Sequence, residues 1–149
     1  MFARRPSRLD RRRGAAIVEF AVVAPLLFAL VIGIVEVGRL VMVSQLATNG
    51  SREAARYAVQ ADATPAAVRA YTESYMAAAG IPADALNGIT LEQQSGGGWV
   101  DVTSLSGVAM GTPVRATLSI NFDRVSWLPS RFFVGDNTAV TGVTVMRKE

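Results

Sequence analysis

The chain has 149 residues, with 15 Lys and Arg against 12 Asp and Glu, no histidine and no cysteine. The missing residue types exclude thiolate chemistry, disulfides, Cys or His metal sites and the histidine-dependent catalytic triads. We therefore expect no catalytic residues, no metal, no cofactor and no small-molecule substrate, and we expect that the protein is not an enzyme.

The positive charge is concentrated at the start of the chain. Six arginines and one aspartate precede Gly14, whereas nine Lys and Arg and eleven Asp and Glu follow it. This basic run adjoins an apolar segment and lacks interleaved aromatic residues that could stack on bases, so we expect no nucleic-acid partner. Residues 1–14 resemble the charged region of an export signal, which predicts a basic leader on the cytoplasmic side.

A long apolar segment follows the leader. No charged residue occurs from Phe20 to Val35, and the flanking residues extend the segment to the ~20 residues that span a bilayer. We predict a transmembrane helix over residues 15–42. The arginines on its N-terminal side place the N-terminus in the cytoplasm and the C-terminal part outside it. The apolar run is not followed by an A-x-A pattern, so we expect no cleavage behind it.

Small residues recur at every fourth position of this helix, at Ala21, Pro25, Ala29 and Gly33. Such a stripe lets another helix approach closely, which predicts helix packing in the membrane. The alternative is that the stripe reflects only the usual composition of membrane helices.

Two charged residues mark the far end of the apolar run. Glu36 and Arg39 lie three positions apart and so share a helical face. We expect an interfacial ion pair between them, with the arginine reaching toward the headgroups.

Helical periodicity continues beyond the span and predicts an extracytoplasmic helix extension over residues 43–62. Small and apolar residues occupy one stripe of this extension, and polar residues surround it. The stripe consists of Val43, Ala47, Gly50, Ala54, Tyr57 and Ala61.

A second helix is bounded by clear start and stop signals. Thr64 can cap it, Pro65 suits the first helical position, and Gly80 followed by Pro82 ends it. We expect its apolar face to consist of Val68, Tyr71, Tyr75 and Ala78.

The remaining sequence changes to the alternation typical of strands. Residues 89–94 and 99–103 flank a glycine-rich turn, residues 114–123 alternate most regularly, and a last strand is expected at residues 139–146. We therefore predict an α+β fold. A long N-terminal transmembrane helix continues into an amphipathic helix, and residues 63–149 form a small extracytoplasmic domain with a second helix and a four-stranded antiparallel sheet.

An aromatic segment separates the last two predicted strands. It contains Trp127, Phe132 and Phe133. These side chains can form a patch for a protein partner, or they can close the open end of the sheet as part of the core.

The start of the chain resembles a known kind of signal. Gly14 is followed by four residues, then by Glu19-Phe20 and a continuous apolar helix. This pattern resembles the class III signal peptide of the type IV pilin superfamily, in which a prepilin peptidase cuts after the glycine. The resemblance implies that Gly14 and Ala15 form the cleavage site and that Glu19 and Phe20 serve peptidase recognition or assembly.

Residues 47–58, which read ATNGSREAARYA, narrow the resemblance. They are similar to the small-residue and arginine segment of TadE-like proteins, the minor pseudopilins of the tight-adherence (Flp) pilus assembly system. Phe20 stands where the pilins often have tyrosine, and the major Flp pilins are far shorter, so a minor pseudopilin is favoured.

The resemblance implies a bacterial inner-membrane protein that assists pilus assembly. Its expected partners are the membrane, the prepilin peptidase and other pseudopilin or pilus-assembly subunits. The alternative is an uncleaved, single-pass membrane-anchored envelope scaffold or adhesin. The N-terminus of the membrane-purified protein distinguishes the two, because processing predicts Ala15 and the alternative predicts Met1.

Overall fold

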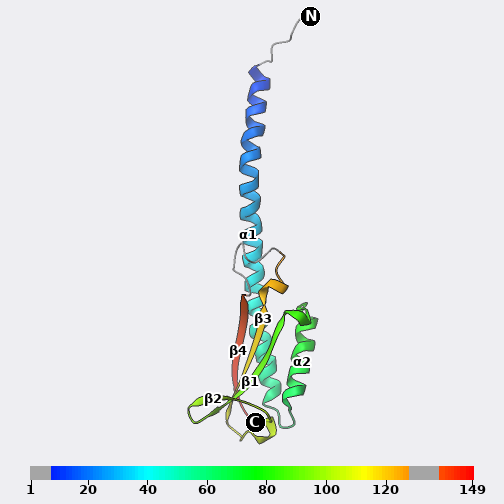
Figure 1. Ribbon diagram of the computed structural model, residues 1–149, viewed down its shortest axis with the longest axis vertical. Coiled ribbons are helices and arrows are strands. Elements are labelled where there is room, and N and C mark those ends of the chain that lie inside the picture. Colours follow the sequence, from blue (N-terminus) through cyan, green and yellow to red (C-terminus); the bar gives the residue numbers. More distant parts are fainter. Residues whose placement is uncertain (1–7, 128–137) are drawn as a thin grey trace, which may run out of the picture. The chain divides into compact units, whose positions relative to one another are not determined.

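A computed structural model of the protein describes residues 8–127 and 138–149, with side chains from Gly14 onward. Figure 1 shows a long helix, a much shorter helix and a sheet. In chain order the elements are α1 (Arg8–Ala58), α2 (Pro65–Ala78), η1 (Ala83–Ala85), β1 (Leu86–Ser95), β2 (Gly98–Asp101), η2 (Leu105–Gly107), β3 (Pro113–Asn121), η3 (Phe122–Arg124) and β4 (Ala139–Arg147). The chain divides into two compact units, residues 1–37 and 38–149, which we describe separately.

The described part of the first unit, from Arg8 onward, is helical and forms the N-terminal part of α1. It remains helical through Pro25, and its apolar side chains are exposed on all sides. Within the described part of the chain, α1 is a helix long and apolar enough to cross a membrane by length and composition. None of its apolar stretch is buried in the protein, unlike the core helix of a soluble domain.

The second unit begins at Gly38 and is built around the C-terminal part of α1. The predicted stripe is confirmed at four positions, since Val43, Ala47, Gly50 and Ala54 are buried. The expectation for Ala61 is wrong: this residue is exposed and follows the end of the helix.

The C-terminal end of the chain binds carbonyl groups at and just beyond the end of α1 at Ala58. The Lys148 ammonium donates to the carbonyl of Ala58 at 3.4 Å and to the carbonyl of Gln60, and the amide of Glu149 donates to Val59 at 3.3 Å. The bond to Ala58 satisfies a carbonyl that has no partner within the helix, and a positive charge there is favoured by the helix dipole.

Helix α2 begins and ends as the sequence predicts. The Thr64 hydroxyl accepts a hydrogen bond from the amide of Ala67 at 3.2 Å, Pro65 is the first helical residue, and Gly80 follows the helix with a φ of 83°. The predicted apolar face is only partly right. The buried residues are Val68, Thr72 and Met76, so the contact stripe is rotated away from Tyr71 and Ala78, which are exposed.

The sheet has the strand order β2-β1-β3-β4, and all its neighbours are antiparallel. A two-residue turn at Gly96 and Gly97 joins β1 to β2, and both glycines have the positive φ that such hairpins need. Together with the two helices, the sheet confirms the predicted α+β fold.

One face of the sheet forms the core. Alternate residues of β3 are fully buried, and the other residues of this strand are half-buried on the opposite face. A Cβ atom at Gly50 of α1 would lie 2.5 Å from Leu118 of β3 and 2.8 Å from Met76 of α2. The two helices and the sheet therefore meet at a glycine, which allows close packing.

Candidate functional site

The predicted cleavage site lies within α1. Gly14 and Ala15 are helical and exposed, and no atom lies within 4 Å of where a Cβ of Gly14 would be. The peptide bond between them is accessible from solvent. A peptidase that binds an extended bond would first have to unwind the helix at this glycine, where unwinding costs least because glycine is a poor helix former.

Glu19 and Phe20 follow one turn further along and are both exposed, Phe20 to 68 %. Glu19 is thus a carboxylate among exposed apolar side chains. In a membrane such a group costs a few kcal/mol unless it reaches the interface or meets a cation. Its position fits either the interface or a contact with another subunit.

The stripe of small residues is also on the surface of the first unit. Ala21, Pro25 and Ala29 are exposed, and Gly33 is half-buried. Their spacing of four residues within an unbroken helix puts them on one gently turning stripe. Packing of another helix against this stripe stays a prediction.

The two charged residues at the end of the apolar run have different surroundings. Glu36 is buried, with 1 % of its surface exposed. Arg39 is half-buried, and its Nε donates to the carbonyl of Val125. The predicted ion pair between Glu36 and Arg39 stays a prediction.

Arg39 also contacts Trp127, the one residue of the predicted aromatic patch that the structure describes. Its guanidinium carbon lies 4.8 Å from the centroid of the Trp127 ring, within the range of a cation–π contact. Trp127 is otherwise exposed, at 74 %. Phe132 and Phe133 lie outside the described residues.

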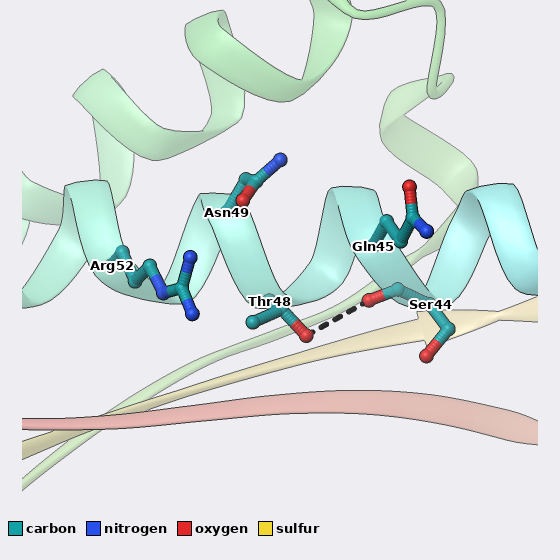
Figure 2. A pocket seen from close by; sticks show the side chains of 5 residues that line it. All are labelled: Ser44, Gln45, Thr48, Asn49 and Arg52. Atoms are coloured by element: carbon teal, nitrogen blue, oxygen red, sulfur yellow. Dashed lines mark hydrogen bonds between the residues drawn. The ribbon is translucent and has the colours of Figure 1, made fainter.

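A shallow polar hollow of about 320 Å³ lies on the exposed side of α1 in the second unit. Figure 2 shows its lining, which comes from this helix alone: Ser44, Gln45, Thr48, Asn49 and Arg52. The Thr48 hydroxyl donates to the carbonyl of Ser44 at 3.0 Å. Arg52 is the single charged side chain of the lining, so the hollow offers hydrogen bonds rather than acid–base chemistry.

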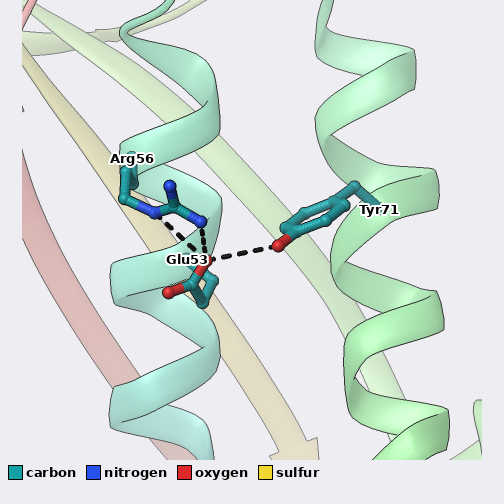
Figure 3. A network of polar contacts seen from close by, with 3 residues as sticks. All are labelled: Glu53, Arg56 and Tyr71. Atoms are coloured by element: carbon teal, nitrogen blue, oxygen red, sulfur yellow. Dashed lines mark hydrogen bonds and ion pairs between the residues drawn. The ribbon is translucent and has the colours of Figure 1, made fainter.

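A second polar cluster joins the two helices (Figure 3). The Nη2 of Arg56 donates to Oε2 of Glu53 at 2.6 Å, and the hydroxyl of Tyr71 in α2 donates to the same oxygen at 3.3 Å. The bond from Arg56 holds the pKa of Glu53 below its usual value. The ring of Tyr71 stacks on Tyr57 at 5.1 Å between centroids. The exposed tyrosine of α2 thus has a structural contact that the sequence analysis did not anticipate.

The open face of the sheet carries a third cluster. Arg115 of β3 makes two hydrogen bonds to Glu92 of β1, of 2.7 and 2.6 Å, and its guanidinium lies 4.4 Å from the Trp99 ring. The bond from Arg115 lowers the pKa of Glu92. Among the residues that the structure describes, no three carboxylates gather in a way that could hold a metal ion.

Comparison with known families gives one match. Residues 14–56 match the family described as TadE-like protein. The matched segment starts at the glycine of the predicted cleavage site and ends at Arg56 of the Glu53 cluster, and it includes the whole lining of the polar hollow. Comparisons with curated proteins and with solved structures gave no match.

Proposed function

We propose that the chain is a minor pseudopilin that assists assembly of a tight-adherence (Flp-type) pilus or secretion system, because residues 14–56 match the TadE-like protein family. A prepilin peptidase cuts it between Gly14 and Ala15. The mature helix then stays in the membrane and packs against other subunits.

The observation that carries the proposal is the coincidence of the matched segment with the exposed helix. The match begins at Gly14, and the side chains that follow are apolar and exposed rather than buried in a core. A helix of this kind needs an apolar environment, which lipid and the helices of neighbouring subunits provide.

The charge distribution supports the proposed topology. All six arginines of the leader precede the apolar helix, so the leader stays in the cytoplasm. The sheet domain, by which we mean the second unit (residues 38–149), is then exported. We therefore place the protein in the bacterial inner membrane as a single-pass protein. The peptidase would reach Gly14 from the cytoplasmic face.

The surface of the second unit supports a role in binding other subunits rather than in converting a substrate. Its exposed features include a hollow with one charged side chain and two clusters in which the carboxylate is already bound by an arginine. A carboxylate held by arginine has a lowered pKa and is a poor proton acceptor at neutral pH. These surfaces fit hydrogen bonding to another protein.

The test is the N-terminus of the protein purified from membranes of a strain that has the peptidase. Mass spectrometry should find Ala15, and Gly14→Leu should accumulate with Met1 retained, because a side chain at this position blocks the site. Gly38→Leu is the matched control, since Gly38 is another α1 glycine with no atom within 4 Å of its Cβ position. It should be processed normally.

Two results would overturn processing at this site. One is a wild-type protein that keeps Met1 in the presence of the peptidase, and the other is a Gly14→Leu protein that still begins at Ala15. The first result would favour the alternative, an uncleaved envelope scaffold or adhesin. The helical state of Gly14 is compatible with that alternative, because the bond is not extended in the intact chain.

A further inference from the structure

Arg39 and Trp127 form a contact between residues that are far apart in the sequence. The Nε of Arg39 donates to the carbonyl of Val125, 86 residues away, and its guanidinium lies over the ring of Trp127. Val125 is buried, which fixes the start of this segment in the core of the second unit. The pair therefore links the sheet domain to one particular level of α1.

That level is the boundary between apolar and polar surface on the helix. Val41 and Met42 still have exposed apolar side chains, whereas Ser44 and Gln45 begin the polar hollow. Ala15 and Arg39 are 24 residues apart, which is about 36 Å of helix and slightly more than the ~30 Å hydrocarbon core. Arg39 thus reaches the headgroup level when the helix spans the membrane.

Both side chains suit this level. The large ring of Trp127 is 74 % exposed, and one of its faces carries the guanidinium. Tryptophan is enriched at membrane interfaces because its ring is apolar while its indole N–H needs a polar partner. The described hydrogen bond of Arg39 uses Nε, and the two terminal nitrogens carry four further N–H donors that match a phosphate group.

We propose that Arg39 and Trp127 form an interfacial anchor that binds the phosphate and ester region of the phospholipid leaflet next to the sheet domain. Because Trp127 lies two residues after the buried Val125, the anchor attaches the core of the second unit to the surface of this leaflet. The proposal requires that α1 crosses the membrane, but it is independent of cleavage after Gly14.

The chain has two tryptophans, Trp99 and Trp127, so each can be observed alone. Trp99 lies over Arg115, which pairs with Val145 of β4. Val145 is three residues before Lys148, whose ammonium binds the Ala58 carbonyl at the end of α1. That end of the helix is 19 residues beyond Arg39, or about 28 Å further along α1. Trp99 is therefore a control that should remain in water.

The full-length protein is reconstituted in vesicles of phosphatidylethanolamine and phosphatidylglycerol that contain lipids brominated near the ester end or near the chain end. Only protein that resists alkaline carbonate extraction is measured, so failed insertion is not mistaken for a negative result. In Trp99→Phe, the emission of Trp127 should be quenched by the shallow bromine more than by the deep one, and acrylamide in water should have little effect.

In Trp127→Phe, the remaining Trp99 should respond in the opposite way, with quenching by acrylamide and none by brominated lipid. Arg39→Gln in the Trp99→Phe background should reduce lipid quenching of Trp127, because both the cation–π contact and the bond to Val125 are lost. Trp127 emission that brominated lipid does not quench overturns the anchor. Accessibility to acrylamide would then place the ring in water, and shielding from both quenchers would place it in a contact within this chain or between two copies of it.

Discussion

Gly142 of β4 lies directly against the backbone of Ala47 in α1. A Cβ at Gly142 would overlap the carbonyl group of Ala47 and come within 2.7 Å of the amide nitrogen of Thr48. Nearby, the hydroxyls of Ser51 and Thr144 are 2.8 Å apart and form a hydrogen bond between the same two elements. The long helix and the edge strand thus meet backbone to backbone, and only glycine fits at this point.

Gly142→Ala should therefore destabilise the second unit. The added methyl group meets backbone atoms that cannot rotate away, so we expect a loss of about 1–3 kcal/mol or more in the free energy of unfolding. Urea unfolding of the full-length protein in detergent, followed by circular dichroism, measures the change. Gly98→Ala on β2 is the control, because its Cβ would meet its nearest neighbour, the carbonyl of Ser95, at an ordinary 3.9 Å. Equal losses for the two variants would contradict the close contact.

Lys148 should stabilise the end of α1. Its side chain is buried, and its ammonium binds the carbonyls of Ala58 and Gln60. Lys148→Met keeps the apolar stem but removes both bonds and the charge at the helix C-terminus, so we expect a loss of about 1–3 kcal/mol. Arg147→Met, at the exposed neighbouring residue, should change stability by no more than about 0.5 kcal/mol. The same unfolding measurement tests both, and an unaffected Lys148→Met protein would rule out the capping role.

The pair of Glu92 and Arg115 should make stability depend on pH in the acid range. The hydrogen bond from Arg115 lowers the pKa of Glu92 in the folded protein below the value of about 4.3 that an unperturbed glutamate has. The contribution of the ionised Glu92 to stability is then fully present above the unperturbed pKa. It is lost as the pH falls through the lowered pKa of Glu92 in the folded protein. The stability difference between wild type and Glu92→Gln should thus be larger at pH 7 than at pH 3.

The control for this prediction is a double-mutant cycle. In an Arg115→Gln background the Glu92 carboxylate has lost its main partner, so Glu92→Gln should produce no pH-dependent difference of this kind. A difference that is unchanged between pH 7 and pH 3 in the wild-type background would show that the pair does not couple to folding.

Glu19 should act in assembly. Cleavage after Gly14 creates an amino group on Ala15, four residues away at helical spacing, and the carboxylate can meet such a cation on a neighbouring subunit. Glu19→Gln should still insert and still be cut, yet fail to co-purify with its partner subunits. Normal co-purification and normal pilus formation would exclude the assembly role, whereas an uncut mutant would assign Glu19 to peptidase recognition.

The sequence by itself determined the elements whose ends depend on local interactions. Thr64, Pro65 and Gly80 bound α2 because capping and backbone freedom act within a few residues. The alternation in β3 was visible because a strand shows its two faces at every second residue. The pattern from Gly14 to Phe20, together with residues 47–58, pointed to the TadE-like family that the comparison matched over residues 14–56.

Only the tertiary structure decided which residues meet across the fold. The buried stripe of α2 runs through Thr72 and Met76 rather than through Tyr71 and Ala78, since Tyr71 stacks on Tyr57 of the other helix. Lys148 binds the carbonyl of Ala58 at the end of α1, 90 residues away, and Arg39 contacts Val125 and Trp127. Periodicity encodes only which face of an element is apolar. The contacts between elements depend on strand order and on the distance at which backbones can pack, and those appear only once the whole core has formed.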